Sequence, residues 1–273
     1  MNSHDLKYKY EQDGVIFPLP ALSTEEVAEA QQNYLQLCAP GKLVLELEQR
    51  IFGHLIHPWI SKLVSHSAIL EKVSFLIGPN ILVWVSEFNA KAPNTPHYFS
   101  WHQDLFYWKH QYQHDFSKIP IVTVWLSLFD THLGNGCMRV IPGSHTHLLA
   151  HSEHSEKFNM LTRCQNLEHN IDEKSSLPIE LKAGEFSIHH PLLHHASGPN
   201  LSSQHRVGLV IRYLSPQVVP PIRPAYAWLV SGEDTSSCWD HVAPINFKTE
   251  NAAENLRYRS MNSVQSCTGS AFK

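Results

Sequence analysis

Two segments of the sequence place histidine and carboxylate side chains in a pattern that suits a metal ion. The first is His102-Gln103-Asp104, and the second is a histidine cluster that contains His189, His190, His194 and His195. A His-x-Asp pair with one distant histidine is the ligand set of two-histidine, one-carboxylate iron sites, which leave one face of the ion open. The pattern therefore favours an iron enzyme that activates oxygen.

The His-x-Asp pair needs context, because the chain contains 20 histidines. Two similar pairs, His151-x-Glu153 and His154-x-Glu156, lie in a polar run, which we expect to be a solvated surface segment. His102 and Asp104 instead have aromatic neighbours, which can form a dry pocket wall. On a strand, residues i and i+2 point to the same side, so both could face one ion while Gln103 faces away. A short loop at the end of a strand could achieve the same arrangement.

An arginine follows the second histidine segment at a suggestive distance. Gly198-Pro199-Asn200 signals a turn, and an apolar strand starts at Arg206. We expect a hairpin here that sets the two strands side by side and directs Arg206 toward the space next to the metal. A planar guanidinium can pair bidentately with a carboxylate, so Arg206 could anchor a bound organic acid. A surface salt bridge is the alternative role for this residue.

The elements that must position these residues change along the chain. The N-terminal part, about residues 1–77, is expected to be helical with one early extended piece at residues 13–18. Ser23 and Glu26 form a capping box that opens a helix ending near Leu37, before Pro40-Gly41. A second helical region is expected from Pro58 to about Ile77.

A β-rich core, about residues 78–215, follows the helical part. Runs of β-branched and aromatic residues predict strands at residues 81–85, 121–128, 138–141, 179–181, 186–188 and 207–213. Short strands between glycine, proline and asparagine turns are typical of a two-sheet barrel. The polar tail, about residues 240–273, is weakly patterned and expected to be partly disordered. We expect one domain spanning residues 1–273.

Composition excludes several classes of protein. With 42% hydrophobic and 17% charged residues among 273, the chain can bury a core and is not disordered. The net charge of −4 and the lack of a long basic run argue against nucleic acid and membrane surfaces as partners. No apolar stretch is long enough to span a bilayer, and the N-terminus lacks an apolar signal core. Five scattered cysteines fit reduced thiols, so we expect a cytoplasmic protein.

Around these residues the chain resembles the phytanoyl-CoA dioxygenase family of iron(II)/2-oxoglutarate oxygenases. The resemblance runs from about Tyr10 to Tyr213. It rests on the order of several blocks and on the spacing of eleven residues between His195 and Arg206. The blocks are Tyr10-Glu11-Gln12-Asp13-Gly14, Gly78-Pro79-Asn80-Ile81, Trp101-His102-Gln103-Asp104-Leu105, Val122-Thr123-Val124-Trp125, residues 135–145 and residues 195–202 with Arg206.

The resemblance implies a fold and a set of roles. The fold is mainly β with flanking α-helices, that is, a double-stranded β-helix of the jelly-roll or cupin-like type. Iron(II) would be bound by His102, Asp104 and His195, with His194 as the runner-up for the third ligand. The distal carboxylate of 2-oxoglutarate would be held by Arg206 and Ser197, with Trp125 and Gln103 lining the same site. O₂ would be the second cosubstrate.

The resemblance also points to a type of reaction. Family members that halogenate replace the carboxylate with a small residue, whereas this chain keeps Asp104. We therefore expect hydroxylation of an unactivated C–H bond with release of succinate and CO₂. The substrate is expected to be a small metabolite, such as an amine, a quaternary ammonium compound or a phosphonate. Aromatic faces can hold such cations, and the candidate pocket residues are Trp84, Trp101, Tyr107 and Trp108.

Three alternatives remain open at this point. An acyl-CoA hydroxylase of the same family is less favoured, because the sequence has no Lys/Arg cluster for a nucleotide diphosphate. A non-catalytic jelly-roll binding protein would have lost a ligand or Arg206. A zinc hydrolase could use two histidines and one aspartate, but it would have no use for Arg206. The sequence gives no indication of the oligomeric state.

Overall fold

The computed structural model describes residues 3–38, 44–45, 47–107, 120–154, 156–161, 163–220, 223–244 and 250–268. Helices lie mainly at the two ends of this chain, and strands fill the middle. The α-helices are α1 (Ser3–Asp13), α2 (Thr24–Leu37), α3 (Leu47–Arg50), α4 (Pro58–Val64), α5 (Ser67–Ile77) and α6 (Glu250–Thr268). The short 3₁₀ helices are η1 (Gly53–Leu55), η2 (Asp104–Tyr107), η4 (Leu133–Asn135) and η5 (Glu173–Ser175).

The strands form two main sheets and one small ribbon. The larger sheet has the order β1-β9-β4-β11-β2-β12-β13, the smaller has the order β3-β10-β5-β8, and β6 pairs with β7. Strands of the larger sheet are β1 (Val15–Pro20), β2 (Ile81–Lys91), β4 (Ile121–Ser127), β9 (Glu185–His189), β11 (Arg206–Leu214), β12 (Tyr226–Ser231) and β13 (Asp240–His241). The others are β3 (Phe99–His102), β5 (Met138–Val140), β6 (His151–Glu153), β7 (Gln165–Leu167), β8 (Leu177–Ile179) and β10 (His195–Ser197).

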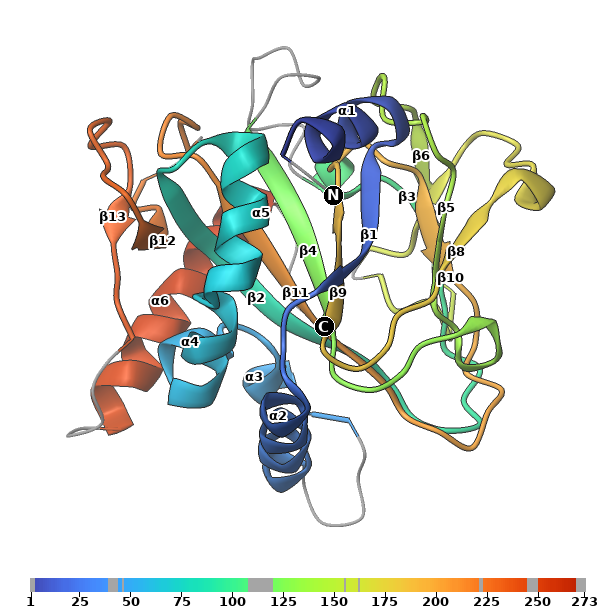
Figure 1. The fold of residues 1–273 in the computed structure, drawn as a ribbon, viewed down its shortest axis with the longest axis horizontal. Helices are drawn as coiled ribbons and strands as arrows, with labels where there is room; N and C mark the ends of the chain where they lie inside the picture. The colour runs from blue at the N-terminus through green and yellow to red at the C-terminus, as the bar shows by residue number, and fades with distance from the viewer. Residues whose placement is uncertain are drawn as a thin grey trace.

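The larger sheet is covered on both faces. Figure 1 shows α4 and α5 on one side of it and the smaller sheet on the other. The helix α6 packs on the second side, where Val264 joins Leu82 and Trp84 of β2 in one apolar cluster. Alternate residues of the central strands, such as Val124 and Leu209, pack with α2, α4 and α5 in the main apolar core. The intervening residues face the smaller sheet, where Trp125 and Val210 pack with Met138. Because side chains alternate along a strand, the inner face of the larger sheet is free to carry polar residues.

The predicted elements and the structure agree in type but differ in several boundaries. The Ser23 capping box is present, since Ser23 and Glu26 exchange side-chain-to-backbone hydrogen bonds at the start of α2. The second helical region is two helices rather than one. The chain turns at Ser65, and the His66 Nδ1 atom accepts a hydrogen bond from the Ala68 N–H group, 3.3 Å away, to start α5. The N-terminal strand β1 pairs with β9, so the helical part contributes a strand to the larger sheet.

Two expectations about the C-terminal half were wrong. The predicted hairpin is absent, because β10 pairs with β3 and β5 in the smaller sheet while β11 pairs with β2 and β4 in the larger sheet. A turn signal marks a reversal of the chain but does not say which sheet receives the next strand. The C-terminal tail contains α6, in which Leu256 and Val264 lie eight residues apart and face the same apolar cluster.

No helix in the described ranges is both long and apolar enough to cross a membrane. The four cysteines in these ranges, Cys38, Cys137, Cys164 and Cys238, carry free thiols.

Candidate active site

Three potential metal ligands meet between the two sheets. His102 ends β3 and lies directly opposite His195 of β10 in the antiparallel register. Asp104 begins η2 immediately after β3, so a loop at the strand end brings it to the same point. The Asp104 Oδ1 atom lies 4.0 Å from His102 Nε2 and 3.9 Å from His195 Nε2. Among the described residues, these three side chains are the group whose ligand atoms converge, all within 4.8 Å of one another.

Both imidazoles are fixed by backbone carbonyls. His102 Nδ1 lies 2.8 Å from the Ser100 carbonyl oxygen, and His195 Nδ1 lies 2.9 Å from that of Leu193. A carbonyl can only accept, so each Nδ1 atom carries the proton and each Nε2 atom keeps a lone pair. Burial lowers the pKa of both histidines, which keeps the rings neutral. Neutral imidazoles with free Nε2 atoms are the form that binds a metal.

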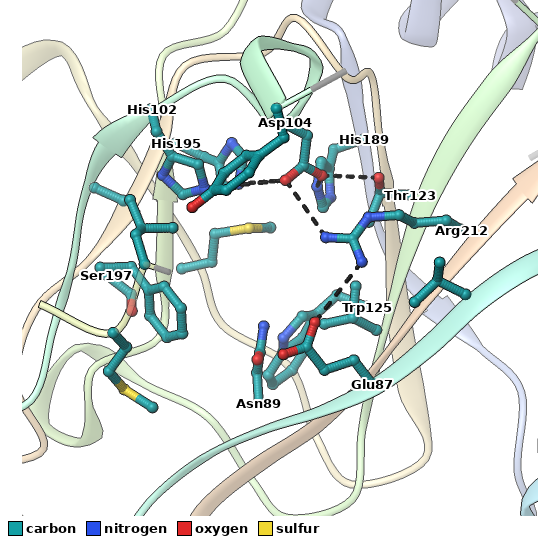
Figure 2. Close-up of a pocket in the computed structure, with 18 of the residues that line it drawn as sticks. Glu87, Asn89, His102, Asp104, Thr123, Trp125, His189, His195, Ser197 and Arg212 are labelled. Carbon is teal, nitrogen blue, oxygen red and sulfur yellow. Dashed lines mark hydrogen bonds and ion pairs between the residues drawn. The ribbon is translucent and has the colours of Figure 1, made fainter. Parts of the chain in front are cut away.

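Asp104 is held in its charged form by residues of the larger sheet. The Thr123 hydroxyl donates to Asp104 Oδ2 at 3.0 Å, Arg212 Nη2 lies 3.8 Å from Oδ1, and His189 Nε2 lies 3.6 Å from Oδ2. Burial disfavours ionisation, but Arg212 and the neighbouring imidazoles more than offset it and hold the pKa of Asp104 well below its ordinary range. Figure 2 shows Arg212 between Asp104 and Glu87.

Arg206 lies at the other end of the same cavity. It begins β11, is 3% exposed, and lies with its guanidinium carbon 4.8 Å from the centre of the Trp125 ring. Its Nη1 atom donates weakly to the Asn89 carbonyl oxygen at 3.4 Å, while its buried Nε atom has no partner in the described residues. Burial lowers the pKa of Arg206 only to about 10, so the side chain is charged at neutral pH.

The approach of Trp125 to Arg206 depends on a glycine. Gly208 lies on β11 one strand away from Trp125, and a Cβ atom on Gly208 would lie 2.0 Å from the indole ring. Glycine inside a strand allows such a close approach of a neighbouring group. The indole therefore lies flat over the β11 backbone, beside the Arg206 guanidinium.

Ser197 lines the cavity opposite Arg206 and is anchored by a buried lysine. Lys91 is 2% exposed and lies opposite Arg206 in the register between β2 and β11. Its ammonium group donates to Ser197 Oγ at 2.5 Å, to the Ser197 carbonyl oxygen at 3.2 Å and to the Gly198 carbonyl oxygen. Burial, and then the charge of Arg206, lower the pKa of Lys91 to about 6.

The cavity brings together most of the residues that the sequence singled out. Its walls include His102, Asp104, His195, Arg206, Ser197, Trp125, Trp84 and Tyr107. Trp108 lies outside the described residues.

The structure contradicts two of the expected cavity residues. Gln103 is fully buried and faces away from the cavity, where its amide donates to the carbonyl oxygens of His147 and Leu192 and its oxygen accepts from the Leu149 N–H group. Trp101 also lies outside the cavity wall, against Arg139 and within 3.5 Å of a Glu173 oxygen. The register of β3 shifts between Phe99 and His102, so these two residues face inward and Trp101 is turned out.

Sequence reasoning missed the polar row that surrounds Asp104. His189, Thr123 and Arg212 lie side by side on β9, β4 and β11, and all three contact Asp104. A period of two from Arg206 places Arg212 on the same face, which is a signal that the sequence contained. Glu87 was missed because β2 was predicted to end at residue 85, although it continues to Lys91.

One segment expected to be a solvated surface supports the motif instead. His151 lies in β6, stacks on Phe106 with ring centres 4.1 Å apart, and accepts the Gln103 N–H group through Nε2 at 3.1 Å. His154 and Glu156 of the second pair are exposed, as expected.

The residues present fit a divalent metal and an organic anion. Two neutral imidazoles and one ionised carboxylate match a two-histidine, one-carboxylate iron site. The unpartnered Nε atom of Arg206, buried beside Trp125, matches a carboxylate partner. Both groups open into one cavity, so a single molecule can contact both.

Comparisons with known proteins identify this combination. Residues 10–208 match the model of the family described as Phytanoyl-CoA dioxygenase (PhyH). The L-proline trans-4-hydroxylase of Streptomyces griseoviridis is 27% identical over 260 residues, which cover 85% of this chain and 93% of that protein. A probable alpha-ketoglutarate-dependent hypophosphite dioxygenase of Stutzerimonas stutzeri is 29% identical over 170 residues. That match covers 61% of this chain and only 57% of the relative.

Solved structures support the same fold. The apo form of ThoJ, a non-heme monooxygenase, superposes with a TM-score of 0.83 at 30% identity, over 97% of this chain and 98% of that one. The mainly β jelly-roll fold that the sequence predicted is therefore confirmed, as two facing sheets that do not close into a barrel. The chain belongs to the phytanoyl-CoA dioxygenase family and is an iron(II)- and 2-oxoglutarate-dependent dioxygenase that uses O₂.

Proposed function

We propose that this enzyme hydroxylates an unactivated C–H bond of a small-molecule metabolite. One C–H bond and one O₂ molecule would be consumed with 2-oxoglutarate, giving an alcohol, succinate and CO₂. The observation that carries the proposal is that the converging atoms of His102, Asp104 and His195 share one cavity with the buried Arg206. Bound iron(II) would supply the oxygen-activating chemistry, with 2-oxoglutarate as the reductant.

Each side chain has a defined part in this proposal. His102 and His195 would bind iron through Nε2. Asp104 would bind through Oδ1, because Thr123 already occupies Oδ2. Arg206 and Ser197 would hold the distal carboxylate of 2-oxoglutarate, and Trp125 would keep water away from that ion pair. Retention of Asp104 leaves no ligand position for a halide, which supports hydroxylation.

Two relatives support a small polar substrate, whereas a third, which covers 54% of this chain, is named for phytanoyl-CoA. One is named for L-proline and another for hypophosphite, and neither substrate carries a nucleotide. The zinc hydrolase alternative is disfavoured, because that reaction needs no buried arginine, whereas Arg206 is buried beside Trp125.

Anaerobic spectroscopy tests the metal and 2-oxoglutarate sites directly. Iron(II) and 2-oxoglutarate added without oxygen should give the weak visible charge-transfer band of a keto-acid chelate. The His102→Ala variant should lose both this band and 2-oxoglutarate-dependent succinate formation. His154→Ala is the matched control, because His154 belongs to an exposed His-x-Glu pair. Undiminished succinate formation by His102→Ala would overturn the metal assignment.

A further inference from the structure

The cavity has a second end that the metal and 2-oxoglutarate leave unused. Arg206, Ser197 and Trp125 line the part assigned to the distal carboxylate of 2-oxoglutarate, and His102, Asp104 and His195 line the part assigned to the metal. The other end, which we call the outer end, is formed by Arg50, Glu87, Trp84, Tyr107 and Val264. These residues come from α3, β2, η2 and α6, and of these elements only η2, which begins with Asp104, also carries a proposed metal ligand.

Arg50 is fixed at the edge of β2. Its neighbour Ile51 forms an antiparallel bridge with Glu87, and the Phe52 N–H group donates to the Ser86 carbonyl oxygen at 2.8 Å. The β12 strand pairs only with residues 81–83 of β2, which leaves this edge to the segment after α3. The Arg50 side chain is 23% exposed and can be reached from the cavity.

The guanidinium of Arg50 is only partly used. Its Nη2 atom lies 3.2 Å from Glu87 Oε1, while its buried Nε atom has no hydrogen-bond partner in the described residues. Glu87 also faces Arg212 Nη1, 3.8 Å from Oε2. One carboxylate is thus shared between two arginines.

Among the described residues that line the cavity, positive side chains outnumber negative ones by one. Three arginines line it, Arg50, Arg206 and Arg212, against the two carboxylates of Glu87 and Asp104. A divalent metal would add two positive charges, and 2-oxoglutarate would add two negative charges. The excess positive charge therefore persists in the fully loaded enzyme, and it lies at the outer end because 2-oxoglutarate would neutralise Arg206.

The rest of the outer end is apolar. Val85, Trp84 and Val264 line the cavity and pack together in one apolar cluster. Such walls suit a short carbon skeleton with one charged group. A quaternary ammonium group would face the excess positive charge, and Trp101, which the sequence offered for an aromatic cage, lies outside the cavity.

We propose that the outer end binds a compact organic anion whose carboxylate or phosphonate group docks on Arg50. The carbon skeleton then lies against Val264 and Trp84, and the C–H bond to be oxidised is presented to the metal. This inference rests on the proposed function, because it assigns the substrate class of the same site. It restricts the substrate class further than the proposed function does, because it excludes the quaternary ammonium compounds that the sequence alone allowed.

Matched pairs of compounds test the proposal. The enzyme, loaded anaerobically with iron(II) and 2-oxoglutarate in a buffer free of small oxyanions, is titrated with three sets of compounds. The first two sets are the proteinogenic L-amino acids and the primary amides of the same amino acids. The third set is 2-aminoethylphosphonate with its partner 2-aminoethanol, and choline serves as the quaternary ammonium control. Binding is read from the shift of the visible band, and succinate release is measured separately in air. At least one acid or the phosphonate should bind roughly tenfold or more tightly than the partner that lacks its anionic group, and the member that binds distinguishes the two oxyanions.

Variants of Arg50 separate the docking group from the rest of the site. Arg50→Gln should weaken binding of the anion by roughly tenfold or more, and Arg50→Lys should restore part of it, because the charge remains but the planar fork is lost. The dissociation constant of 2-oxoglutarate should change less than about twofold, since that anion is held by Arg206. Arg139→Gln is the control, because Arg139 lies outside the cavity against Trp101.

Failure of this inference differs from failure of the proposed function. A missing chelate band in the unaltered enzyme would defeat the proposed function itself. If the band forms but the amides or choline bind as well as the acids, or no anion binds, the inference is wrong. Equal loss of 2-oxoglutarate binding in Arg50→Gln would also overturn it, because Arg50 would then belong to the cosubstrate.

Discussion

Arg206 and Lys91 place two basic side chains next to each other in the interior. They lie opposite one another in the register of β2 and β11, and the described residues provide no carboxylate beside Lys91. Like charges directly opposite in a sheet destabilise it. An anion that neutralises Arg206 would relieve its repulsion with a protonated Lys91. The ligand-free protein therefore favours the binding of an anion at Arg206.

A pH dependence follows from this pair. In the free enzyme the pKa of Lys91 is about 6, with burial as the main cause and Arg206 as the second. A carboxylate on Arg206 offsets that repulsion and raises the pKa, so 2-oxoglutarate binding takes up a proton above pH 6. The affinity should therefore fall as pH rises from about 6 to 8, by at most about tenfold per unit. The Cys137 thiol beside the pair stays neutral, since burial raises its pKa to about 11.

Calorimetry of the nickel(II)-loaded enzyme in buffers of different ionisation enthalpy measures this proton uptake. The histidines near the metal contribute equally to proton uptake in Lys91→Met and in the unaltered chain, so the difference between the two proteins reports Lys91 alone. Lys182→Met is the control, because Lys182 is an exposed lysine paired with Asp130. Identical pH profiles for Lys91→Met and the unaltered chain would contradict the coupling.

Single residues were predictable from the sequence where their chemistry is rare and their spacing is short. The pair of His102 and Asp104 meets that condition, and the structure brings both to one point with His195. Gln103 was misplaced because a motif gives residue types, whereas the direction of each side chain depends on the pleat. Arg212 and Glu87 needed the strand register, which no local pattern contains.

The strand β11 connects both ends of the 2-oxoglutarate site. Arg206 begins it, Gly208 receives the Trp125 ring, and Arg212 reaches Asp104. These residues share one face because side chains repeat every second position. Any change that rotates or bulges β11 will disturb the anion site and the metal site together.

Gly208→Ala tests this role of β11. The new Cβ atom would meet the Trp125 indole at 2.0 Å, so the ring must leave its place beside Arg206. We expect the KM for 2-oxoglutarate to rise by roughly tenfold or more, with a loss of stability of about 1–3 kcal/mol from overpacking. Steady-state kinetics and urea denaturation measure the two effects. Gly198→Ala is the control, because a Cβ atom there would meet nothing within 4 Å, and an equal effect in both variants would refute the explanation.

For helices and strands, the type of each element was easier to predict from the sequence than the element that it packs against or pairs with. The apolar runs marked β2, β4, β9 and β11, but the turn after His195 could not show that the chain crosses to the other sheet. The helix α6 was missed because its composition is mostly polar and its three apolar contact positions, Leu256, Met261 and Val264, matter only against a neighbouring surface. Tertiary packing decides such cases, and the packing surface is distant in sequence.

For the whole molecule, the ligands of the cavity should act as a stabilising link between the sheets. Ligands that bind only the folded state stabilise it by mass action, by about 2.7 kcal/mol at a concentration 100 times the dissociation constant. Saturating nickel(II) with 2-oxoglutarate should therefore raise Tm by about 5 to 10 °C in a chain of this size. A thermal scan measures the shift. His195→Ala should show no such shift, and an equal rise in that variant would mean that the metal binds elsewhere.

The overall class was predictable because composition and strand spacing restrict it, and because the family resemblance covers most of the chain. Physical reasoning from the sequence gave a β-rich core with helices but could not divide the strands between two sheets. The division requires contacts such as that between β1 and β9, whose residues are more than 160 positions apart. Long-range pairing of this kind is set by the assembled core rather than by any one segment.

The two sheets contribute different kinds of residues to the cavity. The histidines of the metal site are on the smaller sheet, paired directly with each other, whereas most of the groups that face organic molecules, apart from Ser197, come from the larger sheet and from nearby helices. Substitutions at α3, β2 or α6 can therefore alter which compound is accepted without moving the imidazoles. Such a layout lets the range of substrates evolve while the oxidising centre is inherited unchanged.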